Sequence, residues 1–152
     1  MNFRTRFGFF SALIAALFIL AACGNGGGGG AASTEHTIAS DPSGFAYQQT
    51  EVAVPVGEQI SVTFENASNV EHNWVLVRGG EDVAQTVNTE GNAAGGPTYL
   101  PEDQSNIIAA TAMLEGGSNE TITFTIDEPD DYRYICTFPG HYPTMAGTLT
   151  AQ

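Results

Sequence analysis

Short segments of alternating hydrophobic and polar residues run through the chain from about residue 36 onward. Residues 50–54 (TEVAV) and 60–64 (ISVTF) alternate with a period of two, which is typical of strands with one buried face. A Pro-Val-Gly-Glu sequence lies between them and favours a turn. Residues 71–77 (EHNWVLV) form a denser apolar run, which favours an interior strand. The first half of the pattern therefore predicts short strands.

The second half of the chain continues this pattern. Residues 107–114 and 120–126 flank the sequence Glu-Gly-Gly-Ser, and we expect them to form a β-hairpin. Residues 132–136 and 147–150 are two further candidate strands. Seven or eight short strands within about 115 residues predict an all-β fold, either a β-sandwich or a Greek-key barrel.

One long segment, residues 79–104, interrupts the strands. It contains EDVAQTVN (81–88), for which we expect a short helix, followed by a loop rich in Gly, Asn and Pro. A long excursion in a compact sandwich is often functional or forms a covering flap. We therefore expect a helix or flap insertion in the β fold.

The first 22 residues have the pattern of an export signal. Arg4 and Arg6 precede an apolar run over 7–20, which has the length of a signal-peptide core and is short for a membrane span. The run ends in Leu-Ala-Ala before Cys23. This arrangement resembles bacterial lipoproteins, in which such a cysteine becomes the lipidated first residue. The alternative is an ordinary signal peptide with Cys23 incidental.

Residues 23–35 are rich in glycine and carry no hydrophobic pattern. We expect a flexible tether behind the lipid on Cys23, although the same composition also fits an unfolded N-terminus without an anchor. The folded domain is expected over 36–152. The protein is then predicted to be exported and held to a membrane on its periplasmic or extracytoplasmic face.

The predicted mature chain is strongly acidic. All 17 Asp and Glu residues follow Cys23, whereas only Arg78 and Arg133 of the four basic residues do, which gives a formal charge of −15. The chain contains no lysine. This charge argues against nucleic acid and anionic lipid surfaces as partners. Attraction to a basic protein partner and simple solubility both remain as explanations.

Cys136 is chemically unusual in this context. If Cys23 is lipidated, Cys136 has no disulfide partner in the chain, and an unpaired thiol in an oxidising compartment needs a reason to persist. Four residues, including Pro139-Gly140, separate it from His141, and three more separate His141 from Met145. A tight turn at Pro-Gly can bring the thiolate, imidazole and thioether together. This soft donor set suits copper.

A trigonal copper site of this kind needs a second histidine. His36 lies near the flexible start, and we interpret it as a solvated residue. His72 opens an apolar run, where a polar side chain needs a partner or a metal. Taken singly, each candidate has an ordinary role in a core or a turn. Their combination predicts a copper site formed by His72, Cys136, His141 and a weakly bound Met145.

Two stretches carry a resemblance to a known family. The sequence CTFPGH with a following methionine, and HNWVL upstream, resemble the blue-copper cupredoxins of the azurin and auracyanin group. The resemblance covers about residues 45–151. It implies an eight-stranded Greek-key β-sandwich and one type 1 copper ion that cycles between Cu(I) and Cu(II). It also implies His72, Cys136 and His141 as equatorial ligands, with Met145 axial and distant.

The resemblance implies roles for neighbouring residues as well. The backbone carbonyl of Glu71 would make a weak axial contact, and the backbone amides of Asn73 and Phe138 would lie near the thiolate sulfur. Such hydrogen bonds tune the reduction potential. The chain departs from the family in three ways. The His141–Met145 gap is as in azurin and one residue shorter than expected of auracyanins, azurin's disulfide is absent, and the surface is acidic and free of lysine.

These observations predict a membrane-tethered electron carrier and not an enzyme, because the metal carries the electron and the protein fixes its surroundings. We expect a monomer that docks weakly with redox partners, basic or membrane-bound complexes. The expected docking surface surrounds an exposed edge of His141 and consists of Pro139, Gly140, Tyr142 and Pro143. The alternative for these four residues is that they only shape the loop. The alternative function is a copper-binding or copper-delivery lipoprotein.

Overall fold

The computed structural model describes residues 31–152, so the predicted signal peptide, the predicted lipidation site Cys23 and most of the predicted tether lie outside the described residues. Eight strands and one helix make up the described part of the chain. The strands are β1 (Glu35–Ala39), β2 (Glu51–Val54), β3 (Gln59–Glu65), β4 (Val75–Val77), β5 (Ile107–Ala110), β6 (Asn119–Thr125), β7 (Asp131–Ile135) and β8 (Ala146–Ala151). The helix α1 (Glu81–Ala94) lies between β4 and β5 in the sequence.

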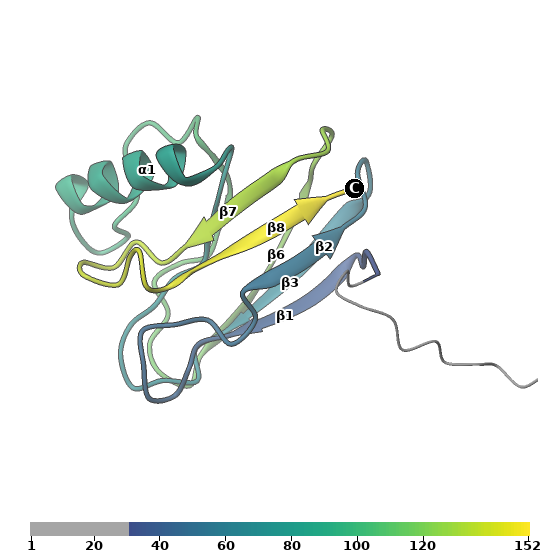
Figure 1. Ribbon diagram of the computed structural model, residues 1–152. Helices are drawn as coiled ribbons and strands as arrows, with labels where there is room; N and C mark the ends of the chain where they lie inside the picture. Colours follow the sequence, from purple (N-terminus) through teal and green to yellow (C-terminus); the bar gives the residue numbers. More distant parts are fainter. Residues whose placement is uncertain (1–30) are drawn as a thin grey trace, which may run out of the picture.

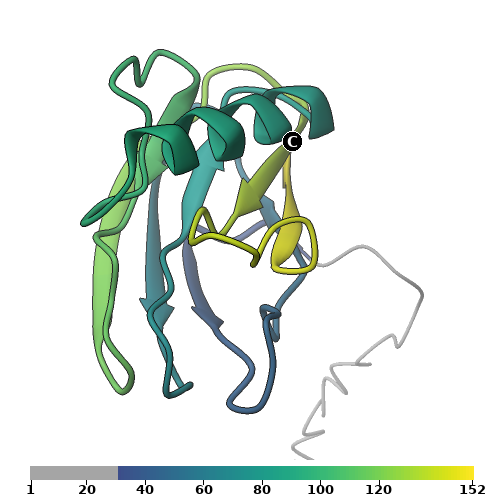
Figure 2. The ribbon, with the colours of Figure 1, turned by 90° about the vertical axis from the view of Figure 1, so that its left-hand side faces the viewer.

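The strands form two sheets. One has the order β1-β3-β6, and the other has the order β2-β8-β7-β4-β5. The pairs β1–β3 and β2–β8 are parallel, and the remaining pairs are antiparallel. Helix α1 and the loop between β7 and β8 lie at the same end of the molecule (Figure 1, Figure 2). The predicted all-β sandwich with a helical insertion is confirmed.

The hydrophobic alternation seen in the sequence places side chains between the sheets. In β3, Ile60, Val62 and Phe64 are fully buried, whereas the residues at both ends of the strand are exposed. They pack in a core that also contains Trp74 and Leu76. Burial of apolar surface on this scale is the main stabilising contribution to such a domain.

Strand β4 is buried on both faces, as its dense apolar sequence predicts. Leu76 faces the core between the sheets, and Val75 and Val77 pack in a second cluster with Ala84 and Val87 of α1. Helix α1 therefore covers the outer face of β4 and β7. The predicted strand over 71–77 is regular only over Val75–Val77, because the residues before it turn toward the metal centre described below.

Helix α1 is longer than the expected segment 81–88, since it continues to Ala94. It ends at Gly95, whose φ of 79° is readily adopted by glycine and whose N–H donates to the Gly91 carbonyl. Gly91 lies inside the helix. This position is a glycine because a side chain there would collide with the backbone carbonyl of Tyr99. The glycine at position 91, which suggests a loop in the sequence, is therefore explained by the close packing of the helix against Tyr99.

The predicted hairpin between 107–114 and 120–126 is wrong. Strand β5 pairs with β4 in one sheet and β6 pairs with β3 in the other, so the connection crosses the sandwich. Its turn is fixed by Asn66, which donates its backbone N–H to the Ser118 carbonyl (2.9 Å) and accepts from the Gly117 N–H (2.7 Å). A Gly-Gly turn signals a reversal of direction but does not specify which strand becomes the partner.

Candidate metal centre

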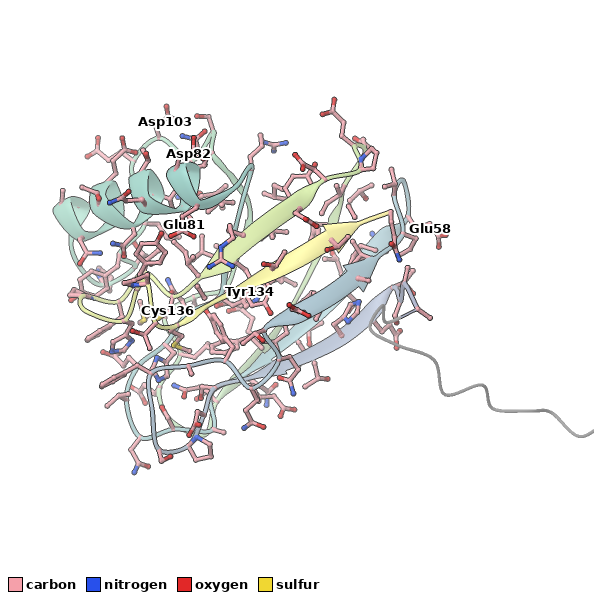
Figure 3. All side chains as sticks on the ribbon, viewed as in Figure 1. Glu58, Glu81, Asp82, Asp103, Tyr134 and Cys136 are labelled. Atoms are coloured by element: carbon pink, nitrogen blue, oxygen red, sulfur yellow. The ribbon has the colours of Figure 1, made fainter. Side chains whose placement is uncertain are left out.

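Three separate elements bring the candidate ligands to one end of the sandwich. His72 precedes β4 and is held by an isolated bridge to Leu114. The His72 N–H donates to the Leu114 carbonyl (3.1 Å), and the Leu114 N–H donates to the His72 carbonyl (2.8 Å). Cys136 directly follows β7, and its N–H donates to the Met145 carbonyl (3.0 Å). His141 lies in the connecting loop, where Met145 donates its N–H to the His141 carbonyl (2.9 Å). Figure 3 shows Cys136 at the end that also carries α1.

The ligand atoms of these residues form a small triangle. His72 Nδ1 and His141 Nδ1 are 3.1 Å apart, and Cys136 Sγ lies 3.8 Å and 3.5 Å from them, respectively. His72 and Cys136 are fully buried and His141 is 5% exposed. A metal bound about 2.0–2.3 Å from nitrogen and sulfur fits inside such a triangle. Two imidazoles and a thiol are a donor set that suits copper, so the residues present fit the implied ion.

Burial controls the protonation of the metal-free site. It raises the pKa of the Cys136 thiol to about 11, and the backbone amides of Asn73 and Phe138, which hydrogen-bond to the sulfur, oppose this shift. Burial lowers the pKa of His72 to about 4, assisted by the charge of His141, and burial also lowers the pKa of His141. Neutral imidazoles are thus ready to bind a metal at neutral pH, whereas the thiol must release its proton.

A reciprocal pair of hydrogen bonds joins the two ligand-bearing segments. Asn73 Nδ2 donates to Thr137 Oγ1 (2.8 Å), and the Thr137 N–H donates to Asn73 Oδ1 (2.9 Å). Both residues are completely buried. Because Asn73 follows His72 and Thr137 follows Cys136, this pair fixes the spacing of the two ligands before any metal binds.

The remaining predicted positions are arranged around this centre. Met145 is fully buried in the same core cluster as Cys136. Glu71, whose carbonyl is the expected weak axial contact, has an exposed side chain and lines a surface depression next to the site. The depression is also lined by Phe45, Asn69, Val70, Phe138, Pro139, Gly140 and His141.

The four residues expected to dock a partner do not all share this depression. Pro139 and Gly140 are exposed and line it. Tyr142 is half-buried, packs in the cluster beneath α1, and donates a hydrogen bond from its hydroxyl to Glu81. Pro143 is exposed outside the depression. The expected exposed edge of His141 is small, because Phe45 packs against its ring at a centroid distance of 4.5 Å.

Phe45 and Val70 are the hydrophobic residues of this surface that the sequence pattern did not reveal. At 50% and 43% exposure, they are the exposed large hydrophobic side chains of the described chain. Phe45 follows the turn-forming sequence Asp-Pro-Ser-Gly, where a lone aromatic side chain has no strand pattern to place it. An aromatic residue in a polar turn is the signal that could have indicated it.

The profile of a protein family, described as copper-binding proteins of the plastocyanin/azurin family, matches residues 34–152. The chain belongs to this family. It is a blue copper cupredoxin of the auracyanin and azurin type, as its sequence motifs predict. One type 1 copper ion is the cofactor of this family, and His72, Cys136 and His141 form the candidate site for it.

Individual relatives agree with this assignment. Auracyanin-A of Chloroflexus aurantiacus is 42% identical over 117 residues, which cover 76% of this chain and 72% of the relative. Azurin of Pseudomonas aeruginosa is 36% identical over 104 residues, covering 62% and 69%. The crystal structure of dithionite-reduced auracyanin from the photosynthetic bacterium Roseiflexus castenholzii superposes with a TM-score of 0.79 at 50% identity. That match covers 80% of this chain and 99% of the solved one.

Proposed function

We propose that this cupredoxin is an exported one-electron carrier, with one copper ion held by His72, Cys136, His141 and Met145. The observation that carries the proposal is the buried triangle of two Nδ1 atoms and one Sγ atom, with sides of 3.1–3.8 Å. Copper bound there would supply the one-electron redox chemistry, alternating between Cu(I) and Cu(II). The protein itself makes and breaks no bonds.

The ligand frame suits this task because it is hydrogen-bonded independently of the metal. The Asn73–Thr137 pair, the Cys136–Met145 backbone bond and the His72–Leu114 bridge hold the ligand-bearing segments together. A frame that cannot relax lets copper change oxidation state with little movement of its ligands. The backbone amides of Asn73 and Phe138 at the sulfur stabilise the thiolate, which affects the reduction potential.

We infer that electrons enter and leave through the depression beside His141. Phe45, Pro139 and Gly140 give this surface an apolar character. Small, weak interfaces suit transient redox partners, and a monomeric carrier fits such brief docking. The negative charge of the chain favours partners that are basic around an apolar centre, including membrane-bound complexes. Pro143 and Tyr142 flank this surface, and Tyr142 also anchors the loop.

A lipid anchor on Cys23 and the glycine-rich segment behind it would keep the carrier near such complexes. Within residues 31–152, no helix has the length and apolar character needed to cross a membrane. The anchor is therefore proposed from the N-terminal sequence alone. Mass spectrometry of the membrane fraction tests it, and an unmodified, fully soluble mature chain would contradict it.

Optical and EPR spectroscopy of the Cu(II)-loaded mature chain, followed by cyclic voltammetry, test the electron-carrier function. We expect an intense thiolate-to-copper absorption band, a small copper hyperfine splitting and a reversible wave. A colourless protein that passes Cu(I) to an acceptor would instead support copper delivery. His72→Ala should abolish the band. His36→Ala is the matched control and should keep it, because His36 lies on β1 and contacts the Ser33 carbonyl (2.9 Å).

A further inference from the structure

We propose that Phe45 is a positioning residue of the copper centre, which holds the His141 imidazole in place and restricts access to the metal from the solvent side. This inference rests on the copper site proposed above and concerns a residue outside the ligand motifs.

The starting observation is the burial of His141 on an exposed loop. Pro139 and Gly140 just before it are exposed, yet the His141 side chain is only 5% exposed. The Phe45 ring packs against the imidazole with a centroid distance of 4.5 Å and an interplanar angle of 30°. Phe45 is itself 50% exposed and lines the same depression as His141. It therefore lies between much of the imidazole and the solvent.

Phe45 also contacts the second histidine. Its ring meets His72 edge-on, with centroids 6.5 Å apart and an interplanar angle of 71°. The centroids of the two imidazole rings are 4.8 Å apart. A single phenyl ring thus packs against both histidine ligands, which places it at the histidine side of the metal triangle.

A second phenyl ring contacts His141, but it belongs to the ligand loop. Phe138 lies 4.6 Å from the imidazole centroid and packs in turn against Tyr99 at 5.4 Å. Because Phe138 and His141 share one loop, they can move together. Phe45 comes from the connection between β1 and β2, so its contact ties the ligand loop to a different part of the fold.

The segment that carries Phe45 is firmly held. Asp41 accepts hydrogen bonds from the N–H (2.7 Å) and hydroxyl (2.9 Å) of Ser43, and its own N–H donates to the Ala46 carbonyl (2.8 Å). On the other side, the buried Tyr47 donates its hydroxyl to the Asn73 carbonyl (2.7 Å). Phe45 is therefore fixed on both sides, which allows its ring to restrain a ligand.

This geometry has two consequences for a bound copper ion. The imidazole must swing outward before copper can leave, and Phe45 opposes that movement. An external ligand that approaches from the depression must pass the same ring. Loss of the ring should accelerate copper release and open the Cu(II) ion to small ligands, without removing any atom that binds the metal.

The test compares Phe45→Ala, Phe45→Tyr and the control Val70→Ala in the copper-loaded full chain. Val70 is an exposed apolar residue of the same depression, but its side chain has no aromatic ring to stack on His141. Two quantities are measured: the rate at which a chromogenic Cu(I) chelator removes copper from the reduced protein, and the change in visible absorption when imidazole is added to the oxidised protein.

We expect Phe45→Ala to lose copper roughly 3- to 10-fold faster and to change its absorption with imidazole, as loss of one aromatic contact predicts. Phe45→Tyr and Val70→Ala should both keep the copper release rate and the imidazole response of the wild type. Equal rates and spectra for Phe45→Ala and Val70→Ala would overturn the proposal. A wild-type protein that forms no blue copper site would instead contradict the proposed function.

A measurement on the metal-free protein tests the contact itself. A phenyl ring stacked on an imidazole shifts the imidazole proton resonances upfield in NMR spectra. Phe45→Ala should therefore move the His141 ring protons downfield, while Val70→Ala leaves them in place. Unchanged His141 resonances in Phe45→Ala would show that Phe45 does not stack on the ligand in solution.

Discussion

At the scale of single residues, Asn73 connects most of the features of the metal centre. Its side chain exchanges two hydrogen bonds with Thr137, and its carbonyl accepts the Tyr47 hydroxyl. Its backbone amide also contacts the Cys136 sulfur. All of these groups are buried, so each would lack water as a substitute partner. Asn73 therefore contributes to stability as well as to the geometry of the ligands.

Asn73→Ala should lower the free energy of unfolding of the metal-free protein by about 2–4 kcal/mol, because the Thr137 N–H and hydroxyl are left buried without partners. Urea unfolding followed by the emission of Trp74, the sole tryptophan and fully buried, measures this. Asn69→Ala is the control and should change stability by less than about 0.5 kcal/mol, since Asn69 is exposed. Similar values for the two variants would contradict the role assigned to the amide.

The residue-scale features differ in how far the sequence predicts them. The assignment of Cys136 and His141 rests on local spacing, and His72 could be chosen because the chain has only two other histidines. These three do converge in the structure. Phe45 could not be predicted in the same way. Its importance depends on a contact between distant segments, which no local pattern records.

At the scale of elements, helix α1 and the ligand loop are joined by a chain of polar contacts. Tyr142 of the loop hydrogen-bonds to Glu81 in the first turn of α1, and Glu81 pairs with Arg133 of β7 (3.2 Å). Arg133 also donates to Thr148 of β8 (3.1 Å). Burial, together with the hydrogen bond and charge of Glu81, raises the pKa of Tyr142 to about 12. These contacts bind the loop to both the helix and the sheet.

A double-mutant cycle with Tyr142→Phe and Glu81→Gln measures this connection. We expect Tyr142→Phe to cost about 0.5–1.5 kcal/mol of unfolding free energy, and the cycle to show a coupling of about 0.5 kcal/mol. The values are modest because the Glu81 side chain is 60% exposed and stays solvated when its partner is lost. Strictly additive effects in urea unfolding would mean that the two side chains do not interact in solution.

For Gly91→Ala in α1, we expect a change in stability opposite to the one that helix propensity alone predicts. Replacing an interior helical glycine with alanine usually stabilises a protein by about 1 kcal/mol. Here the added Cβ would collide with the Tyr99 carbonyl, so Gly91→Ala should lower the melting temperature of the metal-free protein. Ala93→Gly is a matched change at an exposed position of the same helix and should cost about 1 kcal/mol. A more stable Gly91→Ala variant would contradict the close packing.

The same helix shows the limits of prediction for elements. Hydrophobic alternation predicts the strands well, because burial of one face determines both the pattern and the structure. The length of α1 and the pairing of β5 could not be predicted from local sequence. From sequence alone, Gly91 suggests the end of the helix, because the Tyr99 backbone that packs against it comes from the loop that follows the helix. A Gly-Gly turn fits equally well a hairpin and a connection between two sheets.

At the scale of the whole molecule, a tyrosine-rich core lies inside a strongly acidic surface. Figure 3 shows Glu81 and Asp82 on α1, Asp103 near this helix and Glu58 at the opposite end of the molecule, so negative charge is not confined to one face. Tyr47, Tyr132 and Tyr134 are buried. Burial is the main cause that raises the pKa of all three hydroxyls, and Tyr132 is further affected by Asp130 and Glu128 nearby. Ionisation of these groups is therefore disfavoured only while the protein is folded.

This difference predicts a loss of stability in alkaline solution. The unfolded tyrosines ionise near pH 10, whereas the folded ones stay protonated to higher pH, so the unfolded state releases more protons in this range. The free energy of unfolding should change little between about pH 7 and 8.5, above the range in which the lowered pKa values of His72 and His141 act, and should fall as the pH rises through 10 toward the folded pKa values. The buried Cys136 thiol, whose pKa is also raised, adds to this fall in the wild type and the variant alike. Tyr132→Phe removes one of the groups. It should lower stability at pH 8, through loss of the hydroxyl bond to the Glu128 carbonyl (3.0 Å), but make the decline between pH 9 and 11 shallower. Urea unfolding of the metal-free wild type and variant across this range measures both slopes, and parallel declines would show that Tyr132 ionises alike in the folded and unfolded chains.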